Sequence, residues 1–172
     1  MVKIARVGDV RRVVTAERAD GSSYVAIDGP PVRIWGNIAA LWATENGRSV
    51  LPLRGAADDM TPGLATMFGA PGETRVGVLL FPPEGDPPPE GDSLDITLRP
   101  TGKTAGAGWH ATYSYDYLFI VSGELWMFLD EEEVLLKAGD VVVQGGVNHA
   151  WRNKGNVPCL MYSVTLGVPE SS

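Results

Sequence analysis

Cysteine is scarce in this sequence, and regular helical patterning is nearly missing. Cys159 is the single cysteine among 172 residues, so an intrachain disulfide is excluded. It stands in the apolar run Cys-Leu-Met-Tyr, which indicates a buried position rather than a reactive thiol. Because apolar residues seldom recur at helical spacing, the sequence argues against a helix bundle.

An excess of basic residues and a long apolar run are also missing. The net charge of −7 would repel a phosphate backbone, and the basic residues form no stripe, so we expect no nucleic-acid partner. The longest apolar stretches, residues 76–81 and 117–121, fall far below the roughly 20 residues that cross a bilayer, so we expect no membrane partner. The first residues mix charges with apolar side chains and resemble no signal peptide, which favours a cytoplasmic protein.

What the sequence does contain is a succession of short runs rich in β-branched and aromatic residues, bounded by turn formers. Residues 12–15 and 24–27 flank Asp20-Gly21-Ser22, a turn that predicts a hairpin. This pattern predicts an all-β sandwich or barrel in one domain, without a parallel βαβ sheet. Further strands are expected at residues 39–44, 74–81, 94–98, 116–121, 124–129, 133–137, 141–144, 149–153 and 159–166.

Turn signals separate these runs. The stretch 58–63 predicts a loop with a helical turn. The near duplication at 82–92, rich in Pro, Glu, Gly and Asp, predicts an exposed acidic loop that connects elements. Ser122-Gly123 and residues 130–132 predict hairpins, 138–140 a tight corner, and 154–156 a turn that closes the last strand pair.

Both histidines of the chain fall in this strand-rich last third. His110 shares strand parity with Asp116, and His149 shares parity with Trp151, so each pair faces one side of its strand. If both sides point into one barrel, two imidazoles and a carboxylate converge, a donor set that suits Fe, Mn, Ni or Zn. Strand parity also predicts that the side chains of five further residues line the pocket. These are Thr112, Trp151, Leu118, Ile120 and Gln144.

The order of these residues resembles the two motifs of the cupin superfamily over about residues 106–166. The first segment reads His110-x-Thr112-x-x-x-Asp116, followed by Gly123, and the second runs from Gly139-Asp140 to His149-x-x-x-Asn153. The resemblance implies a double-stranded β-helix, the jelly-roll barrel, with an N-terminal strand extension. It implies a barrel over 76–172 and N-terminal strands and loops over 1–75 that pack on the barrel or swap with it.

Two departures from the usual motif bear on chemistry. Thr112 stands where a second histidine is usual, and Asp116 stands where glutamate is usual. The reduced set of His110, Asp116 and His149 is similar to that of cupin dioxygenases of the 3-hydroxyanthranilate type, which implies a divalent metal. The alternative is a metal-free, hydrogen-bonded cluster in the same place, inert or active in proton transfer.

The resemblance implies a small-molecule-processing enzyme that acts on a hydrophobic or aromatic substrate. A metal-dependent reaction of the dioxygenase type is expected first. Alternatives are a redox-neutral isomerase, lyase or decarboxylase with a metal or a His/Asp acid–base pair, and a non-catalytic binding protein. Similar barrels pair their N-terminal strands, so we expect a homodimer formed through the 12–27 hairpin.

Overall fold

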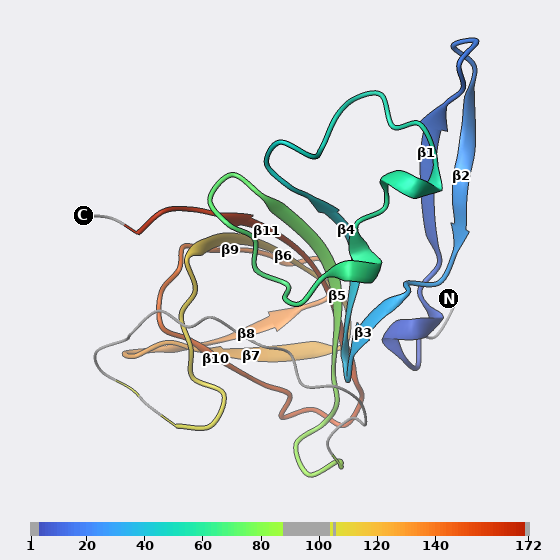
Figure 1. Cartoon of the computed structure of the whole chain (residues 1–172). Helices are drawn as coiled ribbons and strands as arrows, with labels where there is room; N and C mark the ends of the chain where they lie inside the picture. Colours follow the sequence, from blue (N-terminus) through green and yellow to red (C-terminus); the bar gives the residue numbers. More distant parts are fainter. Residues whose placement is uncertain (1–3, 88–103, 105, 171–172) are drawn as a thin grey trace.

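The chain is represented by a computed structural model that describes residues 4–87, 104 and 106–170. Three short 3-10 helices and eleven strands make up this part of the chain, and no helix in it has the length and hydropathy of a membrane span (Figure 1). In chain order they are η1 (Val7–Asp9), β1 (Arg12–Glu17), β2 (Ser23–Gly29), β3 (Arg33–Trp35), β4 (Ile38–Thr44), η2 (Ala56–Asp58), η3 (Thr61–Gly63), β5 (Thr74–Phe81), β6 (Ser114–Ser122), β7 (Glu124–Phe128), β8 (Glu133–Lys137), β9 (Val141–Gln144), β10 (Ala150–Arg152) and β11 (Cys159–Gly167).

These strands form antiparallel sheets, which confirms the all-β jelly-roll expectation. A six-stranded sheet has the order β3-β4-β5-β11-β6-β9, and a three-stranded sheet has the order β10-β7-β8. The strand β6 alternates strictly between buried and exposed residues, as a strand does when one face meets a core and the other meets solvent. The face of β6 that carries Asp116, Leu118 and Ile120 is the buried one.

The main apolar core lies between the six-stranded and the three-stranded sheet. Leu118 and Ile120 of β6 pack there with Leu125 and Met127 of β7 and with Met161 of β11. Cys159 belongs to the same cluster, and its burial, together with the charge of Glu124, raises the pKa of its thiol to about 11. The thiol is therefore protonated at neutral pH, as expected for a core cysteine.

The N-terminal segment covers part of the opposite, outer face of the six-stranded sheet. Val7 and Val10 pack against Ala39, Val78 and Leu160. The hairpin of β1 and β2 forms a separate two-stranded sheet that projects from the body of the molecule (Figure 1). A buried ion pair of 2.9 Å between Arg12 Nη1 and Asp59 Oδ2 fastens the hairpin to the segment that contains η2 and η3.

Several connections differ from the sequence-based expectation. The hairpins β1–β2 and β7–β8 are confirmed, with Asp20-Gly21-Ser22 and residues 130–132 as their turns. Ser122-Gly123 was wrongly predicted as a hairpin turn, because β6 and β7 belong to different sheets. For the same reason residues 154–156 join β10 to β11 without pairing them.

The remaining expectations concern single strands. The short strand β3 was not expected, since three residues give little pattern to recognise. The expected strand at 94–98 and the end of the acidic loop, residues 88–92, lie outside the described residues.

Candidate functional site

The two histidines meet at one end of the barrel. The backbone N–H of each donates to the carbonyl oxygen of the other at 2.9 Å, which forms an isolated antiparallel bridge. Residues that face each other in this way send their side chains to the same side. The two imidazole ring centroids accordingly lie 4.2 Å apart. The expected convergence of His110 and His149 is therefore present.

Each imidazole is held through its Nδ1 atom by a nearby carbonyl group. His110 Nδ1 lies 2.9 Å from the carbonyl oxygen of Gly108, and His149 Nδ1 lies 2.8 Å from that of Val147. A carbonyl oxygen can only accept, so in the neutral imidazole the proton resides on Nδ1. The lone pair of each neutral ring is thus on Nε2, where it can accept a proton.

The surroundings of the two rings differ in burial. His149 exposes 2% of its surface, whereas His110 is half-buried. Burial, followed by the nearby charge of His110, lowers the pKa of His149 to about 4, against the smaller opposite effect of the Val147 carbonyl. His149 is therefore neutral at neutral pH, with Nε2 as an acceptor.

Asp116 is the buried carboxylate of the same strand face. The Ser114 hydroxyl donates to Asp116 Oδ1 at 2.6 Å and lies 2.9 Å from Thr112 Oγ1. Burial raises the pKa of Asp116, while the Ser114 hydrogen bond and the charge of His110 act in the opposite direction. Because Ser114 has one hydroxyl proton, which goes to Asp116, Thr112 supplies the proton of the second hydrogen bond.

Gln144 lies directly opposite Asp116 on the neighbouring strand β9. Both side chains are buried, with 3% and 6% of their surface exposed. Among the described residues, Gln144 Nε2 has no hydrogen-bond partner. A buried amide donor without a partner costs free energy, on the order of 1–3 kcal/mol, and so marks a place where a ligand acceptor would be favourable.

The other predicted pocket residues divide into two groups. The Trp151 ring meets the His149 ring edge-on at 5.5 Å and lies 6.3 Å from the Phe81 ring, so Trp151 forms an apolar wall beside the imidazoles. Leu118 and Ile120 pack in the main core. Ser114 was not among the expected site residues, although it has the same parity between Thr112 and Asp116.

The predicted metal ligands do not all come together. Within residues 4–87, 104 and 106–170, no three side chains of His, Cys, Asp and Glu are grouped so that they could hold a metal ion. The two Nε2 atoms are available, but the short side chain of Asp116 is tied to Ser114. A catalytic metal centre usually takes three protein donors. As arranged, these residues do not supply three donors to one point.

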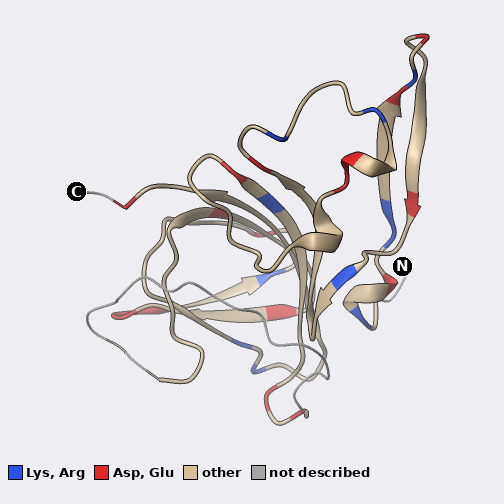
Figure 2. Cartoon of the chain, in the orientation of Figure 1, with Lys and Arg blue, Asp and Glu red and all other residues tan. Residues whose placement is uncertain are grey.

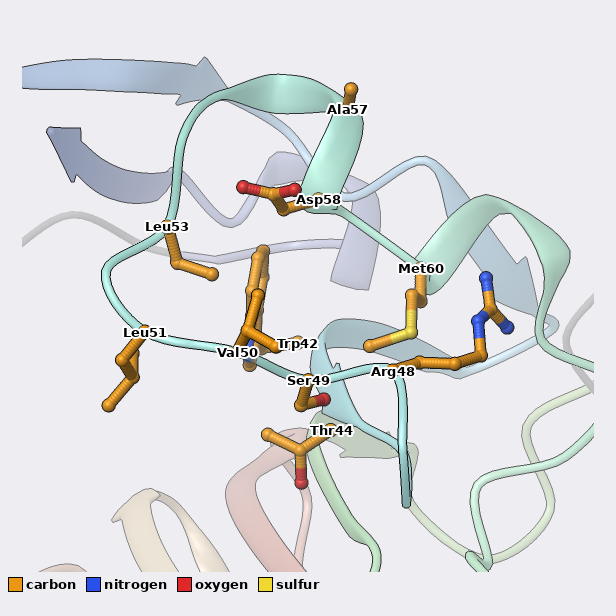
Figure 3. A pocket seen from close by; sticks show the side chains of 10 residues that line it. All are labelled: Trp42, Thr44, Arg48, Ser49, Val50, Leu51, Leu53, Ala57, Asp58 and Met60. Atoms are coloured by element: carbon orange, nitrogen blue, oxygen red, sulfur yellow. The ribbon is translucent and has the colours of Figure 1, made fainter. Parts of the chain in front are cut away.

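A separate cavity of about 390 Å³ is lined by residues of the N-terminal half of the chain, between Trp42 and Met60 (Figure 3). Trp42, Leu53 and Met60 contribute apolar side chains to it. The carboxylate that lines it, Asp58, is occupied by the backbone N–H groups of Arg54 and Gly55. The lining residues of this cavity include neither of the two histidines.

Comparison with protein families identifies the segment that carries this site. Residues 95–165 match the family model described as the Cupin domain. Two fungal proteins illustrate the sequence relatives. Phomopsin biosynthesis cluster protein C' of Diaporthe leptostromiformis is 42% identical over 45% of this chain and 40% of its own length. Oryzines biosynthesis cluster protein J of Aspergillus oryzae is 46% identical over 26% of each. The chain thus matches well under half the length of these relatives.

The solved structures that this chain resembles include the following two. An RmlC-like cupin family protein with a double-stranded β-helix fold from Methanocaldococcus jannaschii has a TM-score of 0.40 and 18% identity, over 58% of this chain and 75% of its own. A variant of salicylate 1,2-dioxygenase from Pseudoaminobacter salicylatoxidans has a TM-score of 0.38 and 17% identity, over 54% of this chain and 22% of its own.

Proposed function

Because residues 95–165 of this chain match the Cupin domain family model, we propose that the protein is a small-molecule-processing enzyme that transfers protons without a metal. The observation that carries the proposal is the pair of imidazoles, 4.2 Å apart, whose Nδ1 atoms are both held by carbonyl oxygens. Both Nε2 lone pairs are then free to accept a proton or a hydrogen bond. Sequence relatives named for biosynthesis clusters are consistent with a small-molecule substrate.

The two histidines take different parts in this proposal. His110 is half-buried, so a substrate can reach its Nε2 atom, and it lies close enough to Asp116 for the two groups to interact electrostatically. It is the general base. His149 is buried and stays neutral, so its Nε2 accepts a hydrogen bond from the substrate. Asp116, held by Ser114, stabilises the charge that develops on His110.

The unpaired amide of Gln144 suggests the group that the substrate presents. An N–H donor without a partner favours an acceptor, and a neutral carbonyl oxygen avoids placing a second negative charge near Asp116. In an unsaturated ketone substrate, the bond between the α-carbon and its proton breaks, and the proton goes to His110 Nε2. Gln144 donates a hydrogen bond to the resulting enolate oxygen. Return of the proton to the γ-carbon of an unsaturated ketone completes a redox-neutral isomerisation. Trp151 and Phe81 supply an apolar wall, which suits a hydrophobic or aromatic substrate.

The state of the two rings can be measured directly, because the chain has two histidines and their imidazole signals are simple to assign. Nitrogen-15 NMR of chelator-treated protein should show both rings as Nδ1–H tautomers at pH 7.5, with His149 remaining neutral down to about pH 4. An Nε2–H tautomer at either ring would contradict the proposed acceptor role.

Activity provides the second arm of the test. With 3-cyclohexenone as the probe, conversion to the conjugated ketone is followed by absorbance in the presence of EDTA. We expect His110→Gln to lower kcat/KM by about 100-fold or more, while Tyr115→Phe, on the opposite face of β6, leaves it unchanged. Capture of the ketone without conversion would instead support a non-catalytic binding protein.

A metal-dependent enzyme, with dioxygenase-type chemistry as expected from the sequence, is the second candidate. The observation that favours it is again the pair of free Nε2 atoms, which supplies two imidazole donors. Elemental analysis of protein purified without a metal-binding tag distinguishes the two candidates. Iron, manganese, nickel or zinc near one per chain, lost in both His110→Ala and His149→Ala, would replace the metal-free proposal.

A further inference from the structure

The cavity beside Trp42 is lined by the end of β4 and by the segment that follows this strand. Its volume of about 390 Å³ falls within the range of about 300–1,000 Å³ that is usual for small-molecule sites. Figure 3 shows the Trp42 ring in the middle of the lining, with Leu53 on one side of it and Met60 on the other. The cavity therefore offers an aromatic ring and two flexible apolar side chains to the apolar part of a ligand.

Two further apolar side chains of the lining stand in solvent. Val50 exposes 64% of its surface, and Leu51 exposes 90%. The two residues are consecutive, and both border the cavity. A ligand with an apolar body would remove part of this surface from water, which is favourable. The rim of the cavity thus suits the same kind of ligand as its interior.

Charged residues of both signs lie along the segment from the end of β4 to η2 (Figure 2). Each arginine of this segment has a carboxylate partner. Arg48 Nη1 lies 2.5 Å from Glu45 Oε2, and Arg54 Nη1 lies 3.0 Å from Glu17 Oε1. The positive charges near the cavity are therefore balanced, so they attract an anionic ligand only weakly.

Asp58 is the acidic residue of the lining, and it has no cationic partner among the described residues. Its Oδ2 atom accepts hydrogen bonds from the backbone N–H groups of Arg54 and Gly55, at 2.5 and 3.2 Å. These bonds fix the orientation of the carboxylate. No described residue donates to its Oδ1 atom. An oriented oxygen and an uncompensated negative charge are thus available to a ligand.

We propose that this cavity binds a small organic cation, a protonated amine with an apolar body. The ammonium group donates a hydrogen bond to Asp58 Oδ1, and an aromatic ring such as that of Trp42 also attracts a cation. The apolar body packs against Leu53 and Met60. The net charge of −7 favours the approach of a cation over that of an anion. Because the lining includes neither histidine, the site is separate from the one proposed for proton transfer.

Isothermal titration calorimetry with phenethylamine, which is protonated at neutral pH, tests the proposal. The neutral 2-phenylethanol and the anionic 3-phenylpropionate carry the same phenyl group and serve as comparison probes. We expect the amine to bind the full chain about 10-fold or more tightly than the alcohol, because the alcohol makes no charge-assisted hydrogen bond. The carboxylate should bind most weakly of the three, since its charge is repelled by Asp58.

The substitution Asp58→Asn removes the negative charge, while the amide oxygen can still accept from the two backbone N–H groups. We expect it to weaken the binding of phenethylamine by about 10-fold or more and to leave that of 2-phenylethanol unchanged. Asp20→Asn is the matched control, because Asp20 also accepts from a backbone N–H group, that of Ser22, but does not line the cavity. It should leave the binding of the amine unchanged.

NMR of the indole N–H groups locates the bound amine. The signal of Trp42, identified by its loss in Trp42→Phe, should shift when phenethylamine is added. His110→Gln should keep full affinity for the amine, so a failure of this site is distinguishable from a failure of the proton-transfer proposal.

Three results would overturn the proposal of an amine site. The first is an unaltered protein that does not bind phenethylamine, or that binds 3-phenylpropionate more tightly. The second is undiminished binding of the amine in Asp58→Asn, and the third is its loss in His110→Gln. If Asp58→Asn proves unfolded by circular dichroism, the ranking of the three probes on the unaltered protein decides.

Discussion

The two faces of β6 differ in almost every physical property. The inward face carries Ser114 and Asp116, followed by Leu118 and Ile120, so a polar end passes into an apolar core. The outward face carries three aromatic rings and a valine, all exposed. Alternation along one strand therefore separates the buried lining of the barrel from an exposed apolar surface.

The comparison shows how similar side chains acquire different energetic roles. On the inward face, an apolar side chain packs against the second sheet and contributes to the stability of the chain itself. On the outward face, an apolar side chain of similar size meets solvent and contributes only if a partner covers it. Exposure, rather than residue type, separates the two roles.

The largest expected effect is on the free energy of unfolding, when one residue of each face of β6 is truncated in turn. Leu118→Ala should lower the free energy of unfolding by about 2–5 kcal/mol, because it opens a cavity in the closed core. Phe119→Ala, one position along, should lower it by well under half as much in the monomer, since Phe119 is 40% exposed. Urea unfolding at low protein concentration measures both. Equal losses would contradict the assignment of the two faces.

The acid dependence of stability is the next largest effect. The pKa of His149 is about 4 in the folded protein and near 6.5 when the chain is unfolded. Between these values the unfolded chain binds a proton that the native protein does not, so stability falls as the pH drops from 6.5 to 4 and is unaffected by His149 above 6.5. The loss amounts to about 3 kcal/mol.

The substitution His149→Gln removes this titrating group, so its unfolding free energy should change less over the same pH interval. Urea unfolding at pH 7 and at pH 4.5 measures the difference. An equal change in the unaltered protein and the variant would show that His149 is not the residue responsible. Phe119→Ala, on the outward face, serves as the control and should keep the full pH dependence.

The smallest expected effect concerns the polar end of the inward face. Ser114→Ala removes a hydrogen bond that favours the ionised form of Asp116, so the pKa of Asp116 should rise further. Carbon-13 NMR of the Asp116 carboxyl group follows it. A lower pKa in Ser114→Ala would mean that the hydroxyl does not stabilise the charge.

Much of the site could be predicted from the sequence because strand parity is local. Strand parity was expected to send Asp116, Leu118 and Ile120 into the barrel, and the burial pattern along β6 agrees with this. The proximity of His110 and His149 was also expected. The role of Ser114 was missed, since a serine between two polar residues of the same parity gives no signal until its hydroxyl is seen against Asp116.

The sequence by itself determined most of the strands, the turns of the β1–β2 and β7–β8 hairpins and the alternation of buried and exposed side chains along β6, because these depend on neighbours along the chain. Only the tertiary structure decided which strands share a sheet, so that Ser122-Gly123 became a corner between sheets. It also decided that His110 and His149 meet while Asp116 stays with Ser114. These outcomes depend on distances across the fold and on the reach of short side chains, which no local pattern contains.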